Sequence, residues 1–167
     1  MTKQFKAGIA SKNITPPVGV ELSGFGFRDR PSEGIHDDLY AKALVLDDGR
    51  EKVSIVTCDL LAMSRDSVER IRRLVEKSTG IKKNNIMISC THTHSGPATI
   101  FLSRCGRIDR RWLETAERKI SEIISQAYKN MEPAKFGVGK GSVDGLNINR
   151  RGTGPNGKVP HINISDP

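Results

Sequence analysis

The chain has 167 residues, a length that fits one domain with a buried core. Hydrophobic residues make up only 36% of it, and 16 glycines and 8 prolines indicate much loop, so the composition favours a loop-rich fold or part of a larger one. The formal net charge of +8 would suit a nucleic-acid binder. No aromatic-interleaved basic motif, helix-turn-helix or zinc-finger spacing accompanies that charge, so we expect no nucleic-acid partner.

The cysteines and the amino terminus indicate an intracellular protein. Cys58, Cys90 and Cys105 include no Cys-x-x-Cys pair, which predicts reduced thiols rather than a disulfide scaffold. The amino terminus lacks the apolar stretch of a signal peptide, and no apolar run approaches transmembrane length. We therefore expect no transmembrane segment and a cytoplasmic location; the oligomeric state stays open.

The first third of the chain predicts strands separated by a long loop. Residues 5–14 read as a strand that ends at consecutive prolines, and residues 19–34 form a loop rich in glycine and charge. Residues 40–46 and 53–58 are apolar runs that flank a turn signal, Asp-Asp-Gly-Arg. This arrangement predicts an antiparallel β-hairpin.

The middle of the chain predicts a βαβ unit. Ser64 can cap a helix that Gly80 ends, and the apolar stripe of this helix comprises Val68, Ile71, Leu74 and Val75. Residues 86–90 then form an apolar strand. Strand 53–58, the helix and strand 86–90 together make a βαβ unit, which is expected to be right-handed.

The last third predicts a second amphipathic helix over residues 110–130, followed by a strand over residues 134–140. The buried face of this helix comprises Trp112, Leu113, Ala116, Ile120, Ile123, Ile124 and Ala127. Residues 141–160 read as loop, and residues 161–167 resemble a strand just beginning. The fold class is therefore α/β: a mixed sheet with a β-hairpin, a βαβ unit and at least two amphipathic helices. We expect residues 1–167 to form a single loop-rich domain that is an incomplete part of a larger one.

Two histidines, His92 and His94, follow the strand 86–90 just before Gly96-Pro97. In an extended chain alternate side chains share a face about 6.6 Å apart, so both imidazoles can converge on one side of the strand end. Open α/β sheets bind ligands at the carboxyl ends of their strands, which favours a metal site here. Zinc takes three or four protein ligands, so the pair supplies at most half a site. Two half-buried histidines bonded to carbonyl groups, with no metal, are the structural alternative.

Other side chains are candidates for the same site. The βαβ unit places Asp59 near His92, where its carboxylate could bind a metal, orient the imidazole or cap the following helix. Cys90, His92 and His94 are alternate residues, so the Cys90 side chain would share the face of the histidines in an extended strand and is a conceivable metal ligand. The favoured interpretation is that Cys90 is buried and packs as a small apolar side chain. His36, flanked by two aspartates, could reach the same pocket or be an ordinary loop histidine.

Four segments resemble the N-terminal part of the neutral/alkaline non-lysosomal ceramidases, in the same order along the chain. They are residues 7–17, residues 34–44, the Thr-His-Thr-His-Ser-Gly-Pro block at 91–97 and the Asn-Ile-Asn-Arg-Arg block at 147–151. The resemblance covers nearly the whole chain. It implies a zinc-dependent hydrolase that cleaves the amide bond of N-acyl-sphingosine.

The resemblance also implies roles for particular residues. His92 matches the histidine that binds zinc in the family, and His94 matches one beside the site; the family's other zinc ligands, a histidine, a glutamate and a tyrosine, lie beyond the part that ends at Pro167. Arg151 stands where ceramide-cleaving members have a serine implicated at the active site. Arginine cannot act as a hydroxyl nucleophile, but its fork of donors suits a carboxylate or phosphate. Arg151 thus indicates either a substrate other than ceramide or a solvated loop.

The functional hypothesis is a zinc-dependent hydrolase of an N-acyl amide bond, in which zinc-activated water attacks the carbonyl. His92 is the predicted zinc ligand, His94 the group that accepts and returns the proton, and His36 and Arg151 contact the substrate, a small-molecule or lipid amide. The alternative is a truncated or degenerate ceramidase-like domain without independent catalysis, which acts as a binding or assembly module.

Overall fold

Five strands form one sheet in the order β4-β3-β2-β1-β5. The computed structural model describes residues 4–26 and 28–146. The strands are β1 (Lys6–Asn13), β2 (Tyr40–Asp47), β3 (Lys52–Cys58), β4 (Ile86–Cys90) and β5 (Glu132–Pro133). β3 and β4 are parallel, and every other neighbouring pair is antiparallel. The predicted mixed α/β sheet, with its hairpin and βαβ unit, is confirmed.

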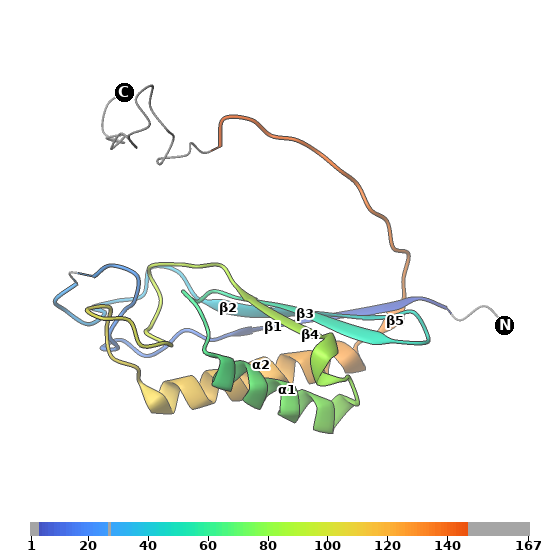
Figure 1. Cartoon of the computed structure of the whole chain (residues 1–167), viewed down its shortest axis with the longest axis horizontal. Helices are drawn as coiled ribbons and strands as arrows, with labels where there is room; N and C mark the ends of the chain where they lie inside the picture. Colours follow the sequence, from blue (N-terminus) through green and yellow to red (C-terminus); the bar gives the residue numbers. More distant parts are fainter. Residues whose placement is uncertain (1–3, 27, 147–167) are drawn as a thin grey trace, which may run out of the picture. The chain divides into compact units, whose positions relative to one another are not determined.

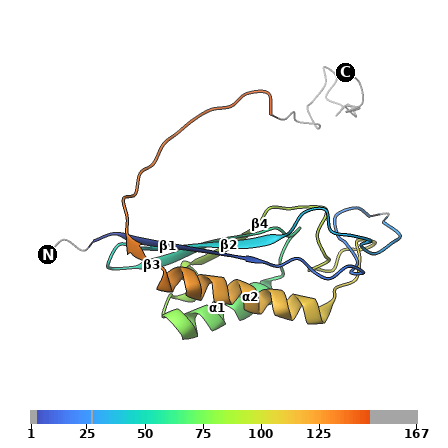
Figure 2. The same ribbon diagram turned by 180° about the vertical axis from the view of Figure 1, so that it is seen from behind.

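Two helices, α1 (Arg65–Thr79) and α2 (Arg110–Lys129), lie on the same face of this sheet (Figures 1 and 2). A short 3₁₀ helix, η1 (Lys83–Asn85), joins α1 to β4. The helices and strands up to residue 136 belong to one compact unit, and residues 137–146 belong to a second unit. None of the helices in the described residues is long and apolar enough to cross a membrane.

The turn and cap residues behave as the sequence predicts. Between β2 and β3, Asp48 Oδ1 accepts from the backbone N–H groups of Arg50 and Glu51, both at 2.8 Å. At the start of α1 the Ser64 hydroxyl accepts from the backbone N–H of Ser67 at 3.1 Å. Gly80 ends the helix in the left-handed conformation, at φ 73°. These local bonds fix where the strands and the helix stop, and so where the loops begin.

The core lies between the sheet and the two helices. All seven predicted apolar positions of α2 are buried, and the indole N–H of Trp112 donates to the carbonyl of Ile14 at 3.1 Å. Gly8 of β1 meets the carboxyl end of α2 so closely that an added Cβ would lie 2.0 Å from the carbonyl oxygen of Ala127. In α1, Ile71 and Val75 are buried, but Leu74, which was predicted to belong to the same buried stripe, is 45% exposed, so that part of the prediction is wrong.

The strand predicted over residues 134–140 is wrong. Only Glu132 and Pro133 pair with β1, opposite Ala7 and Lys6, where β1 itself begins. Beyond them the described residues form no strand, and the apolar side chains of Phe136 and Val138 are 68% and 86% exposed. Apolar and other residues do alternate over 134–140, but β1 begins at Lys6 and has no residue left to pair with them. The predicted loop over residues 141–160 is described only to residue 146, and its remainder and the incipient strand at 161–167 lie outside the described residues.

Candidate active site at the end of strand β4

The histidine block begins where β4 ends, at Cys90. The ladder continues through two backbone bonds to the segment after β3: Thr91 N–H donates to the carbonyl of Cys58, and His92 N–H to that of Leu60, both at 3.0 Å. His92 then adopts φ 63°, in the left-handed region. The chain therefore turns at His92, so strand alternation does not set the direction of the two imidazoles. This corrects the reason for the predicted convergence, although the rings do lie together.

The His92 ring is fixed by a bond to the main chain. Its Nδ1 lies 2.9 Å from the carbonyl oxygen of Leu61, and the side chain is exposed. A carbonyl oxygen only accepts, so Nδ1 carries the proton and Nε2 keeps its lone pair. This is the arrangement found in metal-binding histidines, where a bond to the second nitrogen sets the tautomer and the ring orientation.

The His94 ring lies beside that of His92, with the ring centroids 5.2 Å apart. On its other side, the edge of Phe25 approaches with a centroid distance of 5.0 Å. The guanidinium of Arg28 lies 5.2 Å above the Phe25 ring and donates from Nη2 to the carbonyl of His94 at 3.3 Å. Gly24 passes so close that an added Cβ would lie 2.5 Å from His94 Cγ. A loop far away in sequence thus holds His94.

Sequence reasoning missed Gly24, Phe25 and Arg28. The sequence predicts only a loop rich in glycine and charge over residues 19–34, which includes the tract Ser-Gly-Phe-Gly-Phe at 23–27. The alternation of glycine with aromatic residues inside this loop is the signal that could have indicated a packing contact. Glycine allows close approach of the backbone, and an aromatic ring packs favourably against another ring.

The loop that carries these residues is bound to the histidine segment by backbone bonds. Ser23 N–H donates to the carbonyl of Gly96 at 2.9 Å, and Ala98 N–H donates to that of Glu21 at 3.0 Å. Leu22 and Pro97 form an isolated β-bridge between these bonds. Both views show the two loops gathered at the end of the sheet where β4 stops (Figures 1 and 2).

Asp59 and Cys90 lie near the histidines but are engaged elsewhere. The Asp59 carboxylate accepts from the backbone N–H of Tyr40 at 2.9 Å. Two roles predicted for Asp59 belong to other residues: the carbonyl of Leu61 orients His92, and Ser64 caps α1. Cys90 packs against the core, and burial raises the pKa of its thiol. Burial, with smaller effects of Cys90 and Asp59, also raises the pKa of its strand neighbour Cys58 to about 12. Raised pKa values oppose the thiolate form that binds metals.

His36 lies in the loop before β2 and lines a cavity with residues of the histidine segment. Its side chain is 97% exposed, and its Nδ1 lies 2.6 Å from Oδ2 of Asp37. It lines a cavity of about 370 Å³ together with Thr93, Ser95 and Pro97. The structure therefore brings His36 to the segment that carries the imidazole pair. Arg151, the other predicted substrate contact, lies outside the described residues.

Within residues 4–26 and 28–146, no group of three or more His, Cys, Asp or Glu side chains could hold a metal ion. The two imidazoles are therefore at most part of a metal site. His92 fits such a part well, since its side chain is exposed and no described residue forms a hydrogen bond with its Nε2.

Comparison with known proteins identifies the group to which this chain is related. Residues 5–154 match the family model of the neutral/alkaline non-lysosomal ceramidases, N-terminal part. The chain belongs to the neutral/alkaline non-lysosomal ceramidase family. The neutral ceramidase of Drosophila melanogaster is 29% identical over 156 residues, which are 87% of this chain and 22% of the relative. That of Pseudomonas aeruginosa is 27% identical over 157 residues, 87% of this chain and 23% of the relative.

The fold agrees with that membership. The crystal structure of neutral ceramidase from Pseudomonas aeruginosa matches 78% of this chain with a TM-score of 0.69 and 22% sequence identity. The match covers 22% of that longer chain. This chain therefore has the fold of one part of a ceramidase and spans about a fifth of the length of the relatives it matches.

Proposed function

We propose that this chain contributes the zinc ligand His92 to a zinc-dependent, ceramidase-like hydrolase that cleaves an N-acyl amide bond. The observation that carries the proposal is the geometry of His92: its Nδ1 is bound to Leu61, and its Nε2, beside a second imidazole, has no hydrogen bond to residues 4–26 or 28–146. Membership of the ceramidase family supports a hydrolase and does not favour a pure binding or assembly module.

The metal would be held at Nε2 of His92. Zinc needs three or four protein ligands, so the further ligands belong to polypeptide outside the described residues. When bound, zinc supplies Lewis acidity that activates water and polarises the amide carbonyl. The bond from Nδ1 to Leu61 keeps the imidazole in the tautomer and orientation that binding requires.

His94 is the candidate for proton transfer. Imidazole can take up and return a proton near neutral pH, and the contacts of His94 with Phe25 and Gly24 hold its ring close to that of His92. In this role His94 accepts the proton of the attacking water and returns it to the amine that leaves.

The substrate is an amide of a fatty acid or of a related acyl group. The named relatives are neutral ceramidases, which supports a lipid amide. His36 is the proposed substrate contact, and its position in the lining of the cavity with Thr93 and Ser95 supports this role. Arg151 remains a predicted substrate contact and favours a ligand that carries a carboxylate or phosphate.

The test is zinc binding by the purified chain and by His92→Asn, measured by calorimetry and by imidazole resonances in NMR spectra. Asparagine tolerates the left-handed backbone of position 92 better than alanine does, so the variant isolates the loss of the ligand. The native chain should bind zinc only weakly, because it holds part of the ligand set, and His92→Asn should bind it at least about tenfold more weakly still.

His36→Asn provides the matched control, because it also removes one imidazole, at a position 97% exposed. It should leave zinc affinity unchanged within about twofold. Equal zinc affinity of the native chain and His92→Asn would refute the proposed ligand.

A further inference from the structure

The sheet has one face that no helix or strand among the described residues covers. Both α1 and α2 lie on the opposite face (Figures 1 and 2). We call the uncovered side the open face; its apolar residues are Ala7, Ile9, Leu44, Leu46, Val53, Ile55 and Met87. Four of them are markedly exposed: Ile9 at 70%, Met87 at 53%, Val53 at 38% and Ile55 at 37%.

These residues form continuous rows rather than scattered contacts. The strand registers place Ile9 beside Leu44, Leu44 beside Ile55, and Ile55 beside Met87, so one apolar row crosses four strands. The next row toward the β2–β3 turn is also apolar and joins Ala7, Leu46 and Val53. Directly opposed apolar side chains on one sheet face make a contiguous patch.

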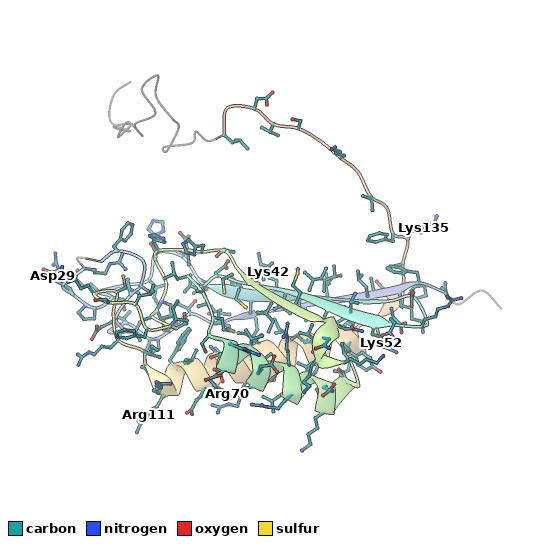
Figure 3. All side chains as sticks on the ribbon, viewed as in Figure 1. Asp29, Lys42, Lys52, Arg70, Arg111 and Lys135 are labelled. Carbon is teal, nitrogen blue, oxygen red and sulfur yellow. The ribbon has the colours of Figure 1, made fainter. Side chains whose placement is uncertain are left out.

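The character of the open face changes toward the histidines. The row on that side consists of Ser11, Lys42, Thr57 and Ser89, all polar and exposed. Figure 3 shows Lys42 on the side of the sheet away from the helices. The apolar rows therefore lie at the end of the sheet remote from His92, with a polar row between them and the candidate site.

A solvated sheet face normally carries polar side chains, so that strands alternate between apolar and polar residues. β2 departs from this rule over residues 44–46, Leu-Val-Leu, where both faces are apolar, and Val53 and Ile55 of β3 lie opposite Leu46 and Leu44 on the open face. A contiguous exposed apolar patch rimmed by polar residues marks an interaction surface.

We propose that the open face packs against a second layer of ceramidase-type polypeptide, namely the part of the catalytic domain outside the stretch that this chain matches. The relatives are long enough to supply it, since the matched stretch is only 22% or 23% of their chains. The layer would cover the apolar rows and stop at the polar row, which leaves His92 accessible. This inference rests on family membership and fold and does not depend on zinc.

The test is co-expression of the full chain with Pseudomonas aeruginosa neutral ceramidase from which the matched stretch has been deleted. The ceramidase part carries an affinity tag, and retention of the chain is quantified after purification with a chelator present. The native chain should be retained at about one copy per ceramidase part. Ile55→Lys should reduce retention at least about tenfold, because a charge enters the buried apolar row.

Leu74→Lys is the matched control, since it replaces an apolar side chain of similar exposure, 45% against 37%, on the helical side of the sheet. It should be retained like the native chain within about twofold. Both variants should keep thermal midpoints within about 4 °C of the native chain, which shows that the fold survives.

No retention of the native chain, or equal retention of Ile55→Lys, would overturn the proposal. A stable dimer of the isolated chain that Ile55→Lys converts to monomer would assign the open face to a second copy and would also overturn it. Because the chelator removes zinc, these outcomes are separate from success or failure of the zinc test.

Discussion

The two imidazoles of the candidate site are held in place by different means. His92 is oriented by one hydrogen bond to Leu61, while His94 is held by close packing against Gly24 and Phe25 and by the bond from Arg28 to its carbonyl. A hydrogen bond fixes the protonated nitrogen, whereas packing fixes the ring position. Loss of loop packing should therefore displace His94 without changing the tautomer of His92.

Gly24→Ala tests this difference. Position 24 has φ 108°, and its added Cβ would lie 2.5 Å from His94 Cγ, so both the backbone and the contact oppose alanine. We expect a loss of roughly 1–3 kcal/mol in the free energy of unfolding and a shift of the His94 imidazole resonances.

Gly26→Ala is the matched control, because an added Cβ there meets no atom within 4 Å and its φ is not positive. It should leave the His94 resonances unchanged. Identical His94 spectra in Gly24→Ala and the native chain would show that the loop does not position this ring.

The site could be predicted from sequence only in part. The spacing of His92 and His94 after an apolar strand predicts the candidate site, and the family resemblance is confirmed. The contacts that orient the rings could not be foreseen, because Leu61 and Arg28 lie 31 and 66 residues away from their partners in the chain. Sequence periodicity reports local structure, whereas these contacts depend on how the loops meet.

At the scale of elements, an ion pair with a buried carboxylate joins the two helices. Arg70 of α1 donates to both carboxylate oxygens of Glu117 of α2, at 2.7 and 2.8 Å, and the Glu117 side chain is only 6% exposed. Burial by itself raises the pKa of Glu117. Hydrogen bonds from Arg70 and Ser67, together with the charge of Arg70, outweigh burial, and the net pKa is lowered.

The pair makes stability depend on pH. Because the pKa of Glu117 is lower in the folded chain than its ordinary value, about 4.3, the unfolded chain binds the proton first as pH falls. Its stabilisation is present above pH of about 5 and is lost as pH falls through the folded pKa. Glu117→Gln should cost roughly 1–2 kcal/mol at pH 7, and the deficit should shrink on acidification, as measured by denaturant unfolding.

Glu122→Gln, which removes an exposed ion pair with Lys12, should cost less than about 0.5 kcal/mol at either pH. A Glu117→Gln deficit that stays constant down to pH 3 would show that the ion pair does not set this dependence.

Elements with their own start and stop signals could be predicted closely. The hairpin and both helices lie within about a residue of their predicted limits, since Asp48, Ser64 and Gly80 act through short local bonds. The strand at 134–140 failed because a strand requires a partner, and β1 begins at Lys6. Periodicity shows which residues alternate, but it does not show whether a neighbouring strand extends far enough to pair with them.

At the scale of the molecule, the two faces of the sheet in the compact unit differ, because helices cover only one of them. The helices cover the apolar interior of the sheet, while the open face keeps two apolar rows exposed.

Amide hydrogen exchange should be slowest in the centre of the sheet and fastest in the segment after β5. The central strands β2 and β3 have partners on both sides and back onto the core, so the amides of Ala43, Val45 and Val56 should exchange slowest. Amides of residues 135–146 should exchange within about tenfold of unprotected rates, because they form no strand. Strong protection of the amides of residues 135–140 from exchange, measured by NMR or mass spectrometry, would show that these residues form a strand after all and would contradict the structure.

The distance between β1 and the carboxyl end of α2 depends on the absence of a side chain at Gly8. At Gly8 the main chain of β1 touches the main chain of α2, and a Cβ there would come within 2.0 Å of the Ala127 oxygen. Elsewhere side chains separate the layers and can exchange volume with their neighbours. At this point no such adjustment is open, so any larger residue at position 8 must lift the carboxyl end of α2 off the sheet, and β5 with it.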